Sequence, residues 1–171
     1  ILEPGDALAY AGEHGFVADA DPEGLAVRHG AAALLQGIPV GGGVGVGRAA
    51  FNRPDADDML RNGDPVVFIG VETSPELLPV MQKAAALVTM RGGASSHAAV
   101  VARQLGTPCV VGVGKPIVDN TLRAGEDVRS GDMLTVDGDS GRLYPGDASE
   151  RVDILTDHER RLRQWAAEAD R

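Results

Sequence analysis

Short apolar runs divide the middle of the chain and predict buried strands. Three of them cover residues 65–71, 84–88 and 109–111, and each is bounded by glycine, proline or polar residues. Continuous apolar runs of this length are typical of strands that are covered on both faces. A further strand is predicted over residues 44–51, where glycines allow close packing. These strands would form the centre of a layered α/β domain.

Two helices are predicted, one before and one after the strand over residues 65–71. Residues 55–61 form a short acidic segment, which Asn62 and Gly63 would end. Residues 76–83 follow Ser74, a candidate N-cap, and a proline suited to the first helical position. Because a helix separates consecutive strands here, the pattern favours packed β and α layers.

The last third of the chain has a different pattern. Apolar and polar residues alternate over residues 131–137 and 141–144, and the turn-forming residues 138–140 separate them, which predicts a β-hairpin. A calcium loop is the alternative for this turn, but the glutamate that such a loop requires is missing. Residues 117–126 are predicted to be a loop with a short helical turn. A charged helix with a thin apolar stripe is predicted over residues 153–171.

The segment between the second and third apolar runs carries the candidate chemistry. Residues 92–93 are glycines, and a helix over residues 98–105 would begin at Ser95 or Ser96 as N-cap. His97 therefore falls in or beside the first helical turn. There the unpaired N–H groups and the positive end of the helix dipole favour a bound anion. A histidine in this position suits the transient carriage of a phosphoryl group.

Composition limits the classes of function. Of the 171 residues, 43% are hydrophobic but only 4% are aromatic, so the core must be built from aliphatic side chains. A net charge of −9 argues against binding to nucleic acid or to an anionic membrane surface. A single cysteine excludes an internal disulfide and fits a reducing cytoplasm, where we expect the protein. Because the chain starts with Ile1, we also expect it to be a piece of a longer protein.

The residues around His97 resemble a known family. Residues 91–103 read RGGASSHAAVVAR and are similar to the phosphohistidine signature of the phosphoenolpyruvate (PEP)-utilising enzymes. These include pyruvate phosphate dikinase, PEP synthase, enzyme I of the sugar phosphotransferase system and the rifampicin phosphotransferases. The segment PCVVG at residues 108–112 favours the dikinase branch. His97 matches the histidine that is phosphorylated in the family.

Two further segments resemble the family. Residues 72–76 read ETSPE, and the resemblance implies that Glu72 and Thr73 lie near the histidine loop. The alternative is a capped helix start, which explains every one of these residues except Glu72. Residues 162–169 are similar to the dikinase segment that leads into a PEP-binding barrel.

The resemblance implies a domain organisation. Residues 34–148 would form a compact α/β swivelling domain, the β/β/α phosphohistidine domain of the family. Residues 1–33 would be a leader or linker from a preceding domain, and residues 149–171 a linker helix towards a PEP-binding barrel that is not in this sequence. The glycines at residues 41–43 replace a segment that usually contains proline, so we expect a flexible hinge there.

The resemblance also implies a function and its partners. His97 would be phosphorylated transiently and would shuttle phosphate between an ATP-grasp domain and a PEP/pyruvate-binding barrel of the parent protein. No cofactor is expected to bind this fragment, no metal site is expected in it, and Mg²⁺ is expected in the partner domains. The fragment alone would be a substrate for phosphorylation and not a complete catalyst. Alternatives are the carrier domain of a PEP synthase or a rifampicin-type phosphotransferase, or a non-catalytic docking module.

Candidate phosphate contacts surround the histidine. They are Arg91, Gly92, Gly93, Ser95 and Ser96. The two serines are more simply N-caps, and Arg91 is equally well explained as a solvated charge. Ser95 occupies the position of a regulatory phosphorylated threonine in plant dikinases. Arg103 lies too far along the helix to share its first turn and is predicted to be a surface charge, and Cys109 a small buried strand residue.

Overall fold

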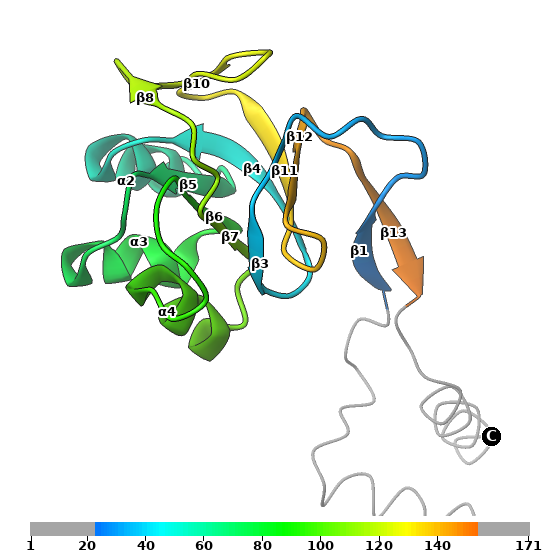
Figure 1. Cartoon of the computed structure of the whole chain (residues 1–171), viewed down its shortest axis with the longest axis horizontal. Coiled ribbons are helices and arrows are strands. Elements are labelled where there is room, and N and C mark those ends of the chain that lie inside the picture. Colours follow the sequence, from blue (N-terminus) through cyan, green and yellow to red (C-terminus); the bar gives the residue numbers. More distant parts are fainter. Residues whose placement is uncertain (1–22, 154–171) are drawn as a thin grey trace, which may run out of the picture. The chain divides into compact units, whose positions relative to one another are not determined.

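The computed structural model of the chain describes residues 23–153, and residues 25–150 form one compact unit. An eight-stranded sheet with the order β2-β12-β11-β4-β5-β6-β7-β3 organises this unit (Figure 1). Its strands are β2 (Leu35–Gln36), β3 (Ile38–Gly41), β4 (Val44–Ala50), β5 (Val66–Gly70), β6 (Ala86–Thr89), β7 (Cys109–Val111), β11 (Met133–Asp137) and β12 (Arg142–Pro145). Strands β4 to β7 pair in parallel, and the flanking strands pair antiparallel. The predicted α/β class and central strands are confirmed.

The helices follow the parallel strands. They are α2 (Arg53–Arg61), the 3₁₀ turn η1 (Pro75–Leu77), α3 (Leu78–Lys83) and α4 (His97–Leu105). Helix α2 begins two residues earlier than predicted because the Asn52 side chain caps it, accepting from the Asp55 N–H at 2.8 Å. The predicted single helix 76–83 is instead divided into η1 and α3. Pro79 has no N–H to donate to the preceding turn, which accounts for the division.

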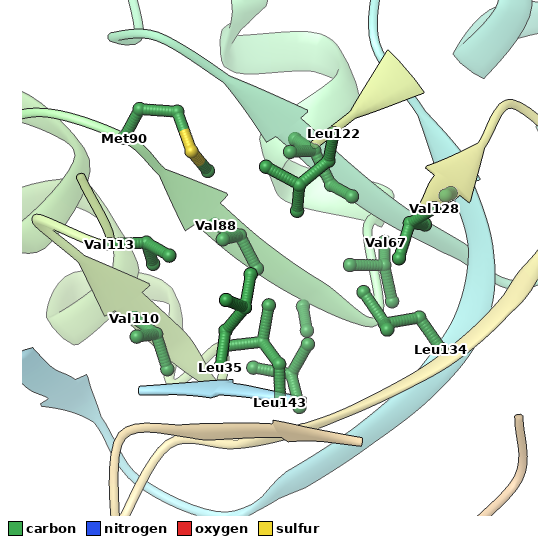
Figure 2. Packing of buried hydrophobic residues seen from close by; sticks show 14 residues of the cluster. Leu35, Val67, Val88, Met90, Val110, Val113, Leu122, Val128, Leu134 and Leu143 are labelled. Carbon is green, nitrogen blue, oxygen red and sulfur yellow. The ribbon is translucent and has the colours of Figure 1, made fainter. Parts of the chain in front are cut away.

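The central strands are buried on both faces, and alternate residues contribute to two cores. On one face Phe68, Leu87 and Val111 pack with buried residues of α3 and α4, and Figure 1 shows α2, α3 and α4 together on one side of the sheet. On the other face Val67 and Val88 pack with residues of β2, β11 and β12 (Figure 2). The domain therefore has three layers. The parallel strands form the middle layer, the helices cover one face of it, and the antiparallel strands fold over the other face.

A small sheet corrects the prediction for residues 117–126. The strands β8 (Ile117–Val118), β9 (Thr121–Leu122) and β10 (Val128–Arg129) form a three-stranded antiparallel sheet where a loop with a helical turn was expected. Asp119 and Asn120 connect β8 and β9, with φ angles of 49° and 53°. Two consecutive residues with positive φ make a tight hairpin turn whose twist matches the strands. Leu122 and Val128 then complete the second core (Figure 2).

The predicted hairpin at residues 131–144 is confirmed as β11 and β12. Asp137 shapes the turn, because its carboxylate accepts hydrogen bonds from the Asp139 N–H and from the Ser140 hydroxyl at 2.7 Å. The flexible hinge expected at residues 41–43 is not what the structure shows. The Gly138 N–H donates to the Gly43 carbonyl at 2.8 Å, and the Gly43 N–H donates to Asp139 Oδ2 at 3.1 Å. These bonds pin the β3–β4 loop to the hairpin turn.

The ends of the described region also pair with each other. Strand β1 (Glu23–Val27) and strand β13 (Ser149–Asp153) form a two-stranded sheet. Residues 149–153 are therefore extended, whereas the linker helix was predicted to start at residue 149. The rest of that helix, and most of the predicted leader 1–33, lie outside the described residues. Within the described part of the chain no helix is long and apolar enough to cross a membrane.

Candidate active site

The candidate site is a pocket at the carboxyl ends of two parallel strands. Segments that follow β5 and β6 enclose a volume of about 270 Å³ together with the start of α4. Its lining residues are Glu72, Thr73, Thr89, Arg91, Gly92, Ser96, His97 and Ala98. Loops at the carboxyl ends of parallel strands are where open α/β sheets commonly bind ligands. The predicted placement of Glu72 and Thr73 beside the histidine loop is confirmed.

Backbone hydrogen bonds fix the start of the histidine loop, residues 90–96. The Arg91 N–H donates to the Val71 carbonyl at 3.0 Å, which ties the loop to the segment after β5. The Gly114 N–H donates to the Met90 carbonyl at 2.9 Å, which ties it to the segment after β7. The buried Thr89 hydroxyl donates to the Arg91 carbonyl at 2.7 Å. The loop therefore leaves the sheet in one defined direction.

The two glycines of the loop differ. Gly92 has a φ of +100°, and a Cβ atom there would lie 2.9 Å from Ser96 Cβ. Its own carbonyl oxygen would lie 2.9 Å from a Cβ atom at Gly112, so two glycines meet where the loop crosses the end of β7. Gly93 has nothing within 4 Å of such an atom. Only Gly92 needs to be glycine for reasons of geometry.

Helix α4 begins at His97 and has both predicted caps. Ser96 is the N-cap, and its hydroxyl accepts from the Ala99 N–H at 3.4 Å. Gly106 ends the helix in the left-handed conformation, with φ 67°. His97 thus occupies the first helical position, where backbone N–H groups have no intrahelical acceptor and the helix dipole is positive.

The His97 imidazole is exposed and has one defined partner. Its Nδ1 atom lies 3.0 Å from the Thr73 hydroxyl oxygen, which is carried by the segment after β5. This contact fixes the orientation of the ring beside the pocket that His97 lines. The other ring nitrogen, Nε2, is then available to a group that approaches from outside.

The structure brings only some of the predicted phosphate contacts to this pocket. Arg91, Gly92 and Ser96 line it beside His97, whereas Gly93 and the exposed Ser95 are not among its lining residues. The described residues 23–153 contain no group of three or more His, Cys, Asp or Glu side chains placed to hold a metal ion.

The predictions for Arg103 and Cys109 are confirmed, and Arg103 also makes a contact that was not predicted. Although Arg103 is exposed, its guanidinium Nη2 donates to the Ala94 carbonyl in the histidine loop, so it is more than a surface charge. Neither this contact nor the Thr89 contact was predicted. Spacing along the helix did not show the Arg103 contact, because the loop folds back along α4.

Cys109 is fully buried in β7, and this burial raises the pKa of its thiol from 9.0 to about 12, against an opposing influence of the Arg103 charge.

Comparison with known proteins identifies this arrangement. Residues 62–141 match the family model described as PEP-utilising enzyme, mobile domain. The chain carries a mobile domain of the PEP-utilising enzymes. The family match includes the β5, β6 and α4 segments that build the pocket around His97. It also includes the β11 strand and the turn that follows it.

Curated relatives of this mobile domain are whole enzymes. The chain is 38% identical over 134 residues to pyruvate, phosphate dikinase of Rhizobium meliloti, covering 76% of this chain and 15% of that protein. It is 35% identical over 143 residues to the Rickettsia conorii dikinase, covering 81% and 16%. It is also 38% identical over 115 residues to phosphoenolpyruvate synthase of Pyrococcus furiosus, covering 66% and 13%. The chain thus spans about 15% of the length of the dikinases that it matches.

Proposed function

We propose that this mobile domain is the phosphoryl carrier of a dikinase-like phosphotransferase. His97 is phosphorylated transiently and shuttles the group between an ATP-grasp site and a PEP/pyruvate site. The observation that carries this proposal is the exposed His97 ring, held by Thr73 at the start of α4 in the pocket after β5 and β6. The matched dikinases and PEP synthase support the reaction class.

The Thr73 contact selects the nitrogen that reacts. In the neutral tautomer with a proton on Nδ1, His97 donates to the Thr73 oxygen at 3.0 Å, and Nε2 keeps its lone pair. Nε2 attacks the phosphorus of the donor, an N–P bond forms, and the donor P–O bond breaks with its electron pair on the leaving oxygen. The positive charge that the ring gains is shared with the Nδ1–H group, which Thr73 still accepts.

The charges around the pocket suit a carrier that must also release its group. Arg91 and the first turn of α4 attract the phosphoryl dianion. Glu72 lines the same pocket and repels it. Opposing charges limit how strongly phosphohistidine is stabilised, and onward transfer requires such a limit because a deeply stabilised intermediate would be slow to react.

The exposure of His97 suits two successive partners. An ATP-grasp domain and a PEP/pyruvate-binding barrel of a longer parent protein each reach the ring in turn, and Mg²⁺ belongs to those partner domains. A ring enclosed in a deep pocket would be inaccessible to both. The carrier supplies the nucleophile and its orientation, and the partners supply the charge neutralisation of in-line transfer.

The test uses the 171-residue chain, ³²P-labelled PEP and the PEP-binding barrel of a matched dikinase. We expect an acid-labile, base-stable label on the unaltered chain and none on His97→Ala. The exposed His29 provides the control, because His29→Ala should be labelled like the unaltered chain. Absence of label from the unaltered chain, or label that persists in His97→Ala, would refute the carrier role and leave a non-catalytic docking module.

A second candidate is the carrier domain of a PEP synthase. The observation that favours it is the 38% identity to the Pyrococcus furiosus synthase, equal to that of the Rhizobium meliloti dikinase over a shorter segment. The dependence of the parent enzyme on inorganic phosphate separates the two, since a dikinase uses phosphate as a second acceptor. A parent protein that turns over without phosphate would favour the synthase or a rifampicin-type phosphotransferase.

A further inference from the structure

Two side chains hold carbonyl groups of the histidine loop. The Thr89 hydroxyl donates to the Arg91 carbonyl at 2.7 Å, and the Arg103 guanidinium donates to the Ala94 carbonyl. The first bond, which we call the Thr89 clamp, holds the loop where it leaves β6. The second, the Arg103 clamp, holds the middle of the loop. Both bonds connect secondary structure, β6 or α4, to the segment that presents His97.

We propose that Thr89 and Arg103 are positioning residues for the phosphorylation of His97, each of which fixes one peptide plane of the loop. This inference rests on the proposed function. In a trans peptide the C=O of one residue and the N–H of the next point in opposite directions. A side chain that holds the carbonyl therefore also sets the direction of the following N–H.

The Thr89 clamp sets the direction of the Gly92 N–H. Gly92 lines the pocket, and its φ of +100° lies in a region where glycine moves freely, so the backbone alone would not hold this plane. Thr89 itself is held firmly, because it is 1% exposed at the end of β6 and its β-branched side chain has few rotamers. The result is a fixed backbone donor beside the position of the phosphoryl group.

The Arg103 clamp acts where packing restrains the loop least. Ala94 and Ser95 are exposed, and Gly93 has open space around it. The bond to the Ala94 carbonyl fixes the plane that leads through Ser95 to the N-cap Ser96, and hence the start of α4 at His97.

A charge effect of Arg103 is the simpler alternative. A cation in the last turn of a helix stabilises it through the dipole, which would change only stability. A direct effect of the charge on the phosphoryl group is a second alternative, because the guanidinium reaches the Ala94 carbonyl in the histidine loop. The positioning role differs from both because it also applies to Thr89, which carries no charge, and because it predicts a change in reaction rate that is independent of folding.

The experiment uses potassium phosphoramidate, which phosphorylates imidazole without a partner domain. Nε2 attacks the phosphorus, the P–N bond breaks, and ammonia leaves. Phosphorylation of the 171-residue chain is followed by ³¹P NMR and the modified histidine is identified by mass spectrometry. Thr89→Val and Arg103→Met are expected to slow His97 labelling about tenfold each, since small misplacements of a reacting group are costly, and Thr89→Ser should restore the rate.

Two matched controls separate position from stability. Thr135 is also a fully buried threonine whose hydroxyl donates to a backbone carbonyl, that of Gly146 at 2.8 Å, but it lies in β11 away from the pocket. Thr135→Val should lower the melting temperature without changing the labelling rate. Gln104→Ala, beside Arg103 on the exposed side of α4, should change neither.

The amide signal of Gly92 gives a second readout. In the unaltered chain its ¹H–¹⁵N resonance should shift when His97 is phosphorylated, and in Thr89→Val that shift should be lost. Labelling rates of Thr89→Val and Arg103→Met equal to that of Thr135→Val would overturn the positioning role while leaving the carrier intact. If Thr89→Val does not fold, the exposed Arg103→Met decides the same question. Failure of the unaltered chain to label at His97 would overturn the proposed function itself.

Discussion

Two glycine-rich loops of this domain look alike in sequence and differ in structure. The histidine loop is open, and Gly93 has nothing within 4 Å of where a side chain would begin. The second loop, residues 41–43, packs tightly against the β11–β12 turn, and we call this contact the closed crossing. A Cβ atom at Gly138 would lie 1.6 Å from the Gly41 carbonyl oxygen, and one at Gly41 would lie 2.2 Å from the Thr107 carbonyl oxygen. Glycine content therefore does not by itself indicate mobility.

The difference follows from what each loop meets. At the crossing, two backbones approach each other so closely that only glycine fits between them. In the histidine loop, close packing is confined to Gly92, and Gly93 has open space where a side chain would begin. Glycine thus allows a close backbone contact at the closed crossing, whereas Gly93 in the histidine loop makes no such contact. Substitutions that add one methyl group should separate the two cases.

The largest effect is expected for Gly138→Ala at the closed crossing. The new methyl group would overlap the Gly41 carbonyl, which is backbone and cannot rotate away. We expect a loss of about 4 kcal/mol in the free energy of unfolding, or failure to fold, as for other severe steric replacements. Urea denaturation measures the loss.

Gly125→Ala is the control for that substitution. Gly125 has no atom within 4 Å and no positive φ, so the change should alter stability by less than about 0.5 kcal/mol. If Gly138→Ala unfolds at the same urea concentration as Gly125→Ala, the crossing is not closed and the contrast between the two loops fails.

A smaller effect is expected within the histidine loop itself. Gly92→Ala should cost about 2 kcal/mol, because an alanine at φ +100° is strained and its methyl group would lie 2.9 Å from Ser96 Cβ. It should also slow phosphorylation of His97, since Ser96 is the N-cap. Unfolding and ³¹P labelling measure the two effects.

The neighbouring glycine is a control that is close to ideal. Gly93→Ala has open space and no positive φ, so stability and labelling rate should stay close to those of the unaltered chain. Equal losses in the two variants would show that the loop does not distinguish its glycines, and the geometric requirement at Gly92 would be wrong.

Local signals in the sequence predicted much of the fold and of the site. The apolar runs that became β5, β6 and β7 are buried on both faces, so their composition alone identified them. Ser96 and Gly106 marked the ends of α4 because caps act within one turn. The β8–β9 hairpin was missed, although Asp119 and Asn120 are residue types that tolerate positive φ.

Contacts between distant segments were harder to predict. The hinge prediction at residues 41–43 failed because the turn at Gly138, nearly a hundred positions away, closes over those glycines. The contact of the exposed Arg103 with the Ala94 carbonyl was missed because spacing along a helix does not show where a preceding loop folds back. Thr73 was placed near His97 by family resemblance and not by any local pattern.

Cys109 offers the smallest effect and the most direct chemical contrast with His97. Its backbone N lies 3.1 Å from where a Cβ atom at Gly138 would be, so it belongs to the closed crossing, and burial raises the pKa of its thiol from 9.0 to about 12. Between these values the folded chain keeps the proton and the unfolded chain loses it. Stability should therefore fall as pH rises above 9, by about 1 kcal/mol per pH unit from this group.

Comparison with Cys109→Ala isolates that contribution, because every other ionisable side chain is present in both proteins. The difference in unfolding free energy between the two proteins, measured in urea from pH 8 to pH 10.5, should change in favour of the variant above pH 9. In the folded protein at pH 8, iodoacetamide should leave Cys109 unmodified while diethylpyrocarbonate modifies the exposed His97. Parallel pH curves, or a thiol that reacts as fast as the imidazole, would mean that the crossing admits solvent. It would then be no more closed than the loop that presents the histidine.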